Sequence, residues 1–272
     1  MGAMGPVLFS LMLAAAHAAE PELIFVSKGT EVLRVTASSL RARPDARIVA
    51  VADPFYGRRK RFRAVPLKSL FSTAYSAVWA EDTLGEVFFA AADGYKSHVK
   101  TGVLMADGGW LAFDDAELPG WEEIPDKGAR AGPFYLFWTG GDQRPRNGFP
   151  WPMRIVSIRT GLLEDEYPKA VPIGSAPDSP AARGWTIFRR DCIACHAMSG
   201  QGGAVGPDLN EPKGVTRFHS AKQLKAYIKK ASEFRHTKMP DFDGLSSADL
   251  NDLMAYLDHM AERTDQAKGA TP

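Results

Sequence analysis

The pattern of apolar and polar positions changes along this 272-residue chain, from short alternating runs to longer helical repeats. Residues 31–36 alternate apolar and polar side chains, which predicts a half-buried β-strand. Similar or more apolar runs predict further strands at residues 47–51, 86–90, 134–138 and 154–158. The part before residue 168 is therefore expected to be rich in β-structure.

Two other elements are predicted in the same part. Residues 104–113 contain Asp107-Gly108-Gly109, and Asp-Gly accepts the positive φ of a tight turn, so we expect a β-hairpin there. Helical spacing of Leu67, Leu70 and Phe71 predicts a helix over residues 66–80. Together these elements indicate an α+β fold.

The last third of the chain shows helical periodicity. Residues 183–188 predict a short helix, and residues 220–234 an amphipathic one, with Ser220 and Gln223 in a capping-box pattern. A final helix is expected from Ser246 or Ser247, with apolar residues at 250, 253, 254 and 257. After Glu262 the chain is polar, and we expect it to fray.

A proline-rich stretch separates the two patterns. Prolines at positions 168, 172, 177 and 180 fix φ and remove backbone donors. We therefore expect two domains, a β-rich α+β domain at residues 20–168 and an all-α domain at 181–264. Residues 169–180 would be a stiff linker, and whether it packs on the first domain is left open.

Composition and charge exclude some partners. Hydrophobic residues make up 45% of the chain and charged residues 24%, as in ordinary globular proteins. The formal net charge of +1 gives no overall bias toward nucleic acid, and no nucleic-acid partner is expected. Residues 58–63 carry a basic run, which fits either an anion-binding surface or a solvated hairpin or edge strand.

The first residues resemble an export signal. An apolar run over residues 7–16 precedes the small-residue pattern Ala16-His17-Ala18, which predicts cleavage after Ala18. The run is short for a membrane anchor, so a signal peptide at residues 1–18 is the favoured interpretation. We expect a periplasmic or secreted bacterial protein without a transmembrane segment after signal removal.

One pentapeptide carries the clearest chemistry. Cys192-Ile193-Ala194-Cys195-His196 contains the only two cysteines of the chain, at the spacing of a c-type haem attachment site. The thiols would add to the porphyrin vinyl groups, and His196 would ligate the iron. A redox dithiol of this spacing usually lies in a βαβ unit, and a structural zinc site needs two more ligands. The sequence shows neither pattern.

The region around this motif resembles class I cytochromes c over residues 181–264. Gly184 and Phe188 match the glycine and aromatic that pack on the last helix, where Tyr256 supplies the facing aromatic. Residues 206–209 match the family's Gly-Pro-Asp-Leu turn. The resemblance implies that the Pro207 carbonyl accepts a hydrogen bond from His196, which orients the imidazole.

The second axial ligand follows from the same resemblance. The segment Thr237-Lys238-Met239-Pro240 matches the family's ligand loop, which implies that the Met239 thioether binds the iron and raises its potential. His236 is the rival ligand. The other methionines of this region fit the role less well, because Met198 is too close to His196 and Met254 and Met260 would fill core space.

The N-terminal part resembles the sulfite-oxidase-type molybdopterin-dependent oxidoreductases. The likeness rests on short elements, Ala64 to Phe71, Ala92-Asp93-Gly94-Tyr95, and Gly132 to Ile158. Those enzymes bind molybdenum through a cysteine thiolate, and residues 20–190 contain no cysteine. We therefore expect a degenerate relative without molybdopterin, kept as a docking or binding module, and not an enzyme.

The combined expectation is a monohaem c-type cytochrome that carries single electrons through one covalent haem held by Cys192, Cys195, His196 and Met239. A lysine-rich helix face at residues 222–230 fits an acidic redox partner protein or a merely solvated surface. Two rivals remain. In one, the N-terminal domain oxidises a substrate and passes electrons to the haem. In the other, Met239 is labile in a haem sensor or peroxidase.

Overall fold

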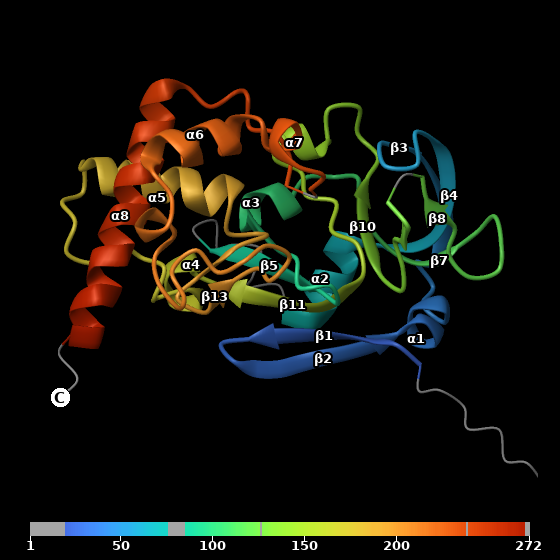
Figure 1. Cartoon of the computed structure of the whole chain (residues 1–272). Coiled ribbons are helices and arrows are strands. Elements are labelled where there is room, and N and C mark those ends of the chain that lie inside the picture. Colours follow the sequence, from blue (N-terminus) through green and yellow to red (C-terminus); the bar gives the residue numbers. More distant parts are fainter. Residues whose placement is uncertain (1–19, 76–84, 126, 238, 270–272) are drawn as a thin grey trace, which may run out of the picture.

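The computed structural model describes residues 20–75, 85–125, 127–237 and 239–269. An N-terminal region rich in β-sheet lies against a C-terminal helical region (Figure 1). The predicted signal peptide at residues 1–18 lies outside the described residues. Within the part of the chain that is described, no helix combines the length and apolar character needed to cross a bilayer.

The larger sheet has five strands in the order β2-β1-β11-β5-β6. Strands β1 and β11 run parallel, whereas the other neighbours are antiparallel, so the sheet is mixed. Strand β6 forms one edge. The bounds are Glu22–Ser27 (β1), Thr30–Thr36 (β2), Glu86–Ala91 (β5), Lys96–Lys100 (β6) and Ile155–Gly161 (β11).

A second sheet has four antiparallel strands in the order β10-β7-β4-β3. Its strands contribute half of the buried aromatic residues of the N-terminal core, namely Phe62, Trp110, Phe113, Tyr135, Phe137 and Trp138. A short β8-β9 pair lies beside it. The bounds are Arg47–Asp53 (β3), Arg58–Pro66 (β4), Gly109–Asp115 (β7), Glu123–Ile124 (β8), Ala129–Arg130 (β9) and Tyr135–Trp138 (β10).

The hairpin predicted over residues 104–113 is wrong. Its expected first arm forms no strand, because Leu104 ends helix α3 (Thr101–Leu104) and residues 105–108 are turn or bend, and its second arm is β7, which pairs with β4 and β10. The Asp107-Gly108 turn is real, with Gly108 at φ 91°, but it joins a helix to a strand. Local turn chemistry fixed the turn, whereas the strand partners are set by residues far away in sequence.

Short helices complete the N-terminal region. The predicted helix at residues 66–80 appears as α2 (Leu67–Tyr75), and the rest of that prediction falls outside the described residues. Leu67, Leu70 and Phe71 of α2 are buried, as the helical spacing required. The remaining elements are α1 (Ala37–Arg41), the 3₁₀ turn η2 (Pro145–Asn147) and α4 (Leu163–Glu166).

The C-terminal region is built on two packed helices, α5 (Pro180–Asp191) and α8 (Ser247–Gly269). A Cβ on Gly184 would lie 2.0 Å from the Asp252 carbonyl oxygen, so only glycine permits this helix crossing. The Phe188 and Tyr256 rings lie 5.0 Å apart, which confirms the predicted contact. The smaller elements are β12 (Ala197–Met198), β13 (Gln201–Gly202), η3 (Val215–Arg217), α6 (Ala221–Lys229) and α7 (Ala231–Phe234).

Two predictions for this region need correction. The helix expected at residues 220–234 is divided at Lys230, which leaves the helical conformation at φ −146°. The predicted capping box of Ser220 and Gln223 is present. Helix α8 continues past Glu262 to Gly269, the last described residue, and there Arg263 bonds the Val171 carbonyl and Asp265 pairs with Arg217.

The side chains form two hydrophobic cores. The larger lies between the two sheets, and the second lies among α5, α8 and the segments around them. Phe88 of β5 belongs to the second core together with Leu163 and Tyr167. The two regions therefore share buried apolar side chains and do not meet only at their surfaces.

The proline-rich segment packs on the helical region. The Ala170 carbonyl accepts a 2.7 Å hydrogen bond from the Tyr256 hydroxyl, and Ala170 is fully buried. The Val171 and Ile173 carbonyls are bonded by Arg263 and His259 of α8. Prolines keep this segment from forming a helix or strand, so its backbone carbonyls are free to accept hydrogen bonds from side chains of α8. We call residues 169–173 the strap, because they lie across α8.

Candidate functional site

The two cysteines and the histidine lie at the C-terminal end of α5. Ser179 caps the start of this helix, with its hydroxyl accepting from the Ala182 N–H, and Pro180 occupies the first turn. At the other end the Ile193 N–H bonds the Phe188 carbonyl, and the His196 N–H bonds the Cys192 carbonyl at 2.9 Å. The motif is therefore one compact turn that follows directly from the helix.

Both thiols are free and half-buried. Burial, with the nearby Asp191 carboxylate, raises the pKa of the Cys192 thiol to about 12. Burial also raises the pKa of the Cys195 thiol, with a contribution from Asp93 of the N-terminal region. Both shifts share the same main cause, because burial disfavours the charged thiolate.

A glycine-rich stretch runs back along the motif. We call residues 192–207 the motif loop. The Gly203 and Gly206 N–H groups bond the Ile193 and Cys195 carbonyls, each at 2.8 Å. A Cβ on Gly206 would lie 2.4 Å from Cε1 of the His196 ring, and one on Gly203 would lie 2.1 Å from the Ala194 carbonyl oxygen. Glycine is required here because backbone and imidazole approach so closely.

The orientation of the His196 ring is set by one hydrogen bond. Nδ1 of His196 lies 2.8 Å from the Pro207 carbonyl oxygen. Because a carbonyl can only accept, Nδ1 carries the hydrogen and Nε2 keeps its lone pair. Proline suits this position, since it has no N–H of its own to compete in the turn. This arrangement leaves Nε2 as the metal-binding atom.

Asp208 and Asn210 organise the turn and were not singled out from the sequence. The Asp208 carboxylate accepts from the backbone N–H groups of residues 199, 200, 210 and 211. Asn210 is buried and donates to Ser199 and to the Met260 carbonyl and Thr264 of α8. The position of Asp208 just after Gly-Pro could have indicated its role in the turn. No local sequence pattern indicates the long-range partners of Asn210.

Met239 lies in a separate segment between α7 and α8. Its side chain is half-buried, and its N–H donates to the Thr237 hydroxyl at 3.1 Å. The segment is anchored to α6 and α7, because Phe242 N–H bonds the Ile228 carbonyl and the Asp241 carboxylate accepts from Ser232. Cys192, Cys195, His196 and Pro207 come together in the motif loop, and the role of Met239 stays a prediction.

The competing residues fall into two groups. Met198, Met254 and Met260 are buried in the second core, as expected for residues that fill space. His236, the rival ligand, is exposed and lies on the same segment as Met239. The three buried methionines take part in core packing, whereas Met239 and His236 do not belong to that core.

The N-terminal region approaches the motif loop through the β5–β6 turn, residues 92–95. The Lys96 N–H donates to the Ala194 carbonyl, and the Ala204 N–H donates to the Gly94 carbonyl, each at 2.9 Å. A Cβ on Gly94 would lie 3.0 Å from Cβ of Ala204. The Asp93-Gly94-Tyr95 turn is thus fitted against the outer side of the motif, a contact that no sequence pattern predicts.

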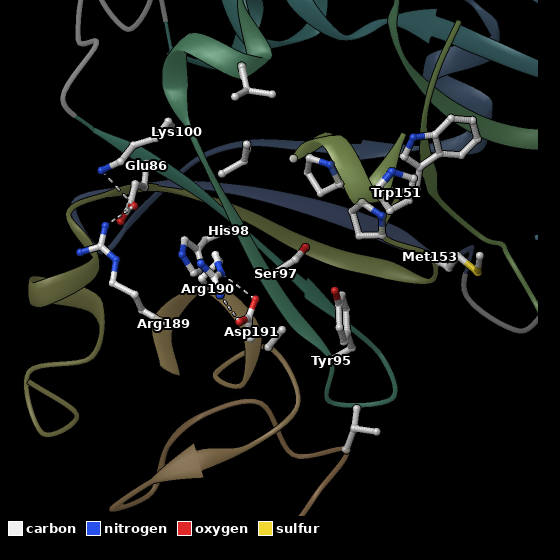
Figure 2. Close-up of a pocket in the computed structure, with 18 of the residues that line it drawn as sticks. Glu86, Tyr95, Ser97, His98, Lys100, Trp151, Met153, Arg189, Arg190 and Asp191 are labelled. Atoms are coloured by element: carbon white, nitrogen blue, oxygen red, sulfur yellow. Dashed lines mark hydrogen bonds and ion pairs between the residues drawn. The ribbon is translucent and has the colours of Figure 1, made fainter. Parts of the chain in front are cut away.

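An ion-pair cluster holds the same interface. Glu86 of β5 is 3% exposed and is bonded by Arg189 of α5 at 3.3 Å and by Lys100 of β6 at 3.1 Å (Figure 2). Arg189 also bonds Glu164. Because a buried carboxylate needs a partner, Glu86 ties the first helix of the C-terminal region to the edge of the sheet.

The basic run at residues 58–63 is part of the fold. Lys60 is fully buried and bonds the carboxylates of Asp115, Glu117 and Glu122, and Arg58 bonds the last two. Burial opposes the charge of Lys60, but these hydrogen bonds prevail and raise its pKa. The run lies in the β3–β4 hairpin, as one of the two interpretations expected. However, its strand β4 is in the centre of the sheet and not at the edge. Lys60 and Arg58 therefore form ion pairs within the fold.

Four tryptophans of the N-terminal region are buried or packed on its core. Trp110, Trp138 and Trp151 are less than 9% exposed, and Trp121 packs against the same core.

The lysine-rich face predicted at residues 222–230 is exposed to solvent at Lys222 and Lys230. Among the described residues, neither forms an ion pair.

The donor set fits a covalent haem. Two thiols adjoin an imidazole whose Nδ1 is held and whose Nε2 is available for iron. Helix α6 is amphipathic, yet none of its residues is buried, so its apolar side chains Leu224 and Ile228 are only partly covered by protein. Partly covered apolar side chains of this kind are suited to contact with a flat apolar macrocycle.

Comparison with known protein families matches residues 181–261 to the cytochrome c family. A search of curated proteins finds no match for the chain. The family match lies wholly in the helical region and gives no support to the resemblance of the N-terminal region to sulfite-oxidase-type domains. Residues 181–261 are a cytochrome c domain, and the Cys192–Cys195 pair within it is consistent with one covalent haem c.

Proposed function

We propose that this protein is a periplasmic or secreted monohaem cytochrome that carries single electrons through a haem c ligated by His196 and Met239. The observation that carries the proposal is the 2.8 Å contact between His196 Nδ1 and the Pro207 carbonyl, next to the two thiols. A haem bound here would supply one-electron redox chemistry. The chain's own residues decide how that chemistry is tuned.

His196 acts as an oriented, neutral donor. The Pro207 carbonyl holds the Nδ1 hydrogen, which increases the electron density at Nε2 and fixes the plane of the ring. Gly206 lets the backbone lie against the ring without a Cβ in the way. The expected effect is strong, geometrically fixed ligation on one face of the macrocycle.

Met239 is the proposed ligand on the other face. Its thioether is soft and neutral, which favours the reduced iron and raises the potential. Support comes from the anchoring of its segment to α6 and α7, and from the burial of the other methionines of this domain in the core. Two strong axial ligands would leave no open position for peroxide or oxygen chemistry.

The N-terminal region is proposed as a docking or binding module for this electron carrier. It contacts the outer side of the motif loop through residues 94 and 96 and through the Glu86–Arg189 ion pair. The exposed Lys222 of α6 and Lys230 just after it fit an acidic redox partner, because complementary charge accelerates encounter. Export agrees with the signal-like first residues and with the chemistry of haem attachment.

The axial assignment is tested by comparing Met239→Ala with His236→Ala in protein purified with its haem attached. Met239→Ala is expected to remove the methionine-to-iron charge-transfer band of the oxidised protein and to lower the haem potential, because the thioether no longer stabilises reduced iron. His236→Ala is expected to leave both unchanged. Absorption spectra and a redox titration give the two readouts.

Two results would contradict the assignment. An unchanged potential and band in Met239→Ala would show that another group ligates the iron. A wild-type spectrum without the methionine band would indicate an open or bis-histidine site, and would favour a haem sensor or peroxidase over an electron carrier.

A further inference from the structure

A cavity of about 960 Å³ lies where the edge strand β6 faces the motif loop (Figure 2). We call it the inter-region cavity. Its walls come from β6, from residues 150–153, and from the end of α5 with Ala194 and Val205 of the motif loop. This volume is within the range of small-molecule sites, and the cavity borders the loop that carries the two cysteines.

One side of the cavity is apolar and rigid. Tyr95, at the end of the β5–β6 turn, and Ser97 of β6 face Trp151 and Met153 (Figure 2). The facing segment is fixed by hydrogen bonds from Trp138 Nε1 to the Pro150 carbonyl and from the Leu136 N–H to the Pro152 carbonyl. A fixed, extended segment opposite a strand gives two stiff walls, which favour a flat ligand over a bulky one.

The cations that line the cavity already have partners. Lys100 and Arg189 bond the buried Glu86, and Arg190 bonds Asp191. Lys127 lies over the Phe55 ring at 4.3 Å. An anionic ligand would compete with these carboxylates for Lys100, Arg189 and Arg190, which weakens its binding. The charge pattern therefore selects a neutral ligand.

One polar group in the cavity lacks a partner. The Ser97 hydroxyl oxygen is buried and has no hydrogen-bond partner in the part of the chain that the structure describes, and the residue is 7% exposed. A buried hydroxyl without a partner is unfavourable, so its presence needs an explanation. Because a hydroxyl donates and accepts, a ligand hydroxyl or carbonyl oxygen satisfies it equally well.

We propose that the inter-region cavity binds a neutral, planar aromatic compound carrying a hydroxyl or carbonyl oxygen, with the Ser97 hydroxyl as its hydrogen-bond partner. Phenols, naphthols and quinones form this class. The inference goes beyond the proposed electron-carrier function and does not depend on which residue is the second axial ligand.

The test is calorimetric titration of the haem-loaded protein with 2-naphthol, which is planar and neutral at pH 7. We expect saturable binding to one site. Ser97→Val is expected to weaken that binding 5- to 10-fold, about 1–1.4 kcal/mol, because the hydrogen bond is lost. Ser97→Thr has nearly the shape of the valine variant but keeps the hydroxyl, and it is expected to bind within 2-fold of the parent protein.

Two controls separate binding from folding and from charge. Ser157→Val changes a serine of β11 in the same sheet that does not line the cavity, and it should leave the affinity unchanged. Naphthalene-2-carboxylate has the same ring system with a negative charge, and it should bind at least 10-fold more weakly than 2-naphthol. Thermal melts of Ser97→Val, Ser97→Thr and Ser157→Val verify that each variant is folded.

Three outcomes would overturn the proposal. These are the absence of saturable binding of 2-naphthol, equal affinities of Ser97→Val and Ser97→Thr, and binding of naphthalene-2-carboxylate as tight as that of 2-naphthol. None of these outcomes concerns the haem spectrum, so failure here is distinct from failure of the axial-ligand assignment.

Discussion

At the scale of single residues, the site depends on close approaches that only a few side chains permit. The His196 ring is enclosed by Gly206 on one side and by the Pro207 carbonyl on another. Such contacts leave no room to relax, because protein interiors are packed as densely as crystals. Small changes at these positions should therefore alter the chemistry more than the fold.

Gly206→Ala is expected to displace the His196 imidazole, because the new Cβ would lie 2.4 Å from Cε1. We expect a lower haem content after purification and a shifted haem potential, measured by haem-to-protein ratio and redox titration. Gly141→Ala is the matched control, since no atom lies within 4 Å of its Cβ position. Equal haem content and potential in Gly206→Ala and the parent protein would contradict the close packing.

Asp45 provides a pH-dependent contribution to stability. The hydrogen bond from Arg43, against the effect of burial and with help from Ser69, lowers the pKa of Asp45 from 3.8 to about 2. A lowered pKa stabilises the fold above the unfolded value, and the contribution is lost as the pH falls through about 2. Asp45→Asn should cost up to about 2 kcal/mol at pH 7 and much less at pH 2.

Urea unfolding of the parent protein and of Asp45→Asn at several pH values measures this difference. The gap between the two proteins should narrow as the pH falls from 4 to 2. A gap that stays constant over that interval would show that the carboxylate is not held by Arg43 in solution.

At the scale of elements, charge that looks like a binding surface in the sequence is used to hold strands together. Lys60 of β4 reaches Asp115 at the end of β7 and two glutamates beyond it. Strand pairing brings these groups together across more than fifty positions of sequence. A basic run is therefore weak evidence of an anionic partner until its acidic neighbours are known.

Lys60→Met should destabilise the protein by about 3–5 kcal/mol, because it leaves the buried Asp115 without a cation. Arg59 is the neighbouring residue and is exposed, so Arg59→Met should change the free energy of unfolding by less than about 0.5 kcal/mol. Denaturant unfolding monitored by circular dichroism gives both values. Equal effects of the two substitutions would mean that the buried network contributes nothing specific.

The sequence predicted the elements that depend on local patterns. The capping box of Ser220, the Gly184–Tyr256 helix crossing and the motif turn with Pro207 follow from short spacings or from family resemblance. The strand β1 was missed, because residues 23–26 are one continuous apolar run, which periodicity alone does not assign to a strand or a helix. The wrong hairpin at residues 104–113 shows the same limit, since strand partners are chosen by distant residues.

At the scale of the whole molecule, the two regions form a continuous unit. Phe88 of the sheet is buried in the core of the helical region, and Glu86 is bonded across the interface. The strap at residues 169–173 fastens to α8. No sequence pattern could reveal this, because Phe88 and Glu86 look like ordinary strand residues.

Unfolding of the two regions should therefore be coupled. Guanidinium unfolding followed by haem absorbance and by circular dichroism of the sheet should give coincident transitions, because separation would expose Phe88 and leave Glu86 unpaired. Glu86→Ala should weaken the coupling and separate the two curves. Two well-resolved transitions in the parent protein would instead describe independent domains.

The contact between the Gly94 turn and the motif loop has a consequence for the order of maturation. The Ala194 carbonyl, between the two cysteines, is occupied by the Lys96 N–H, and both thiols are half-buried. Machinery that joins the cysteines to a porphyrin must reach that loop from outside. Because the β-rich region emerges first during synthesis, we expect thioether formation to come before its closure onto the loop, and early closure to leave the chain without its cofactor.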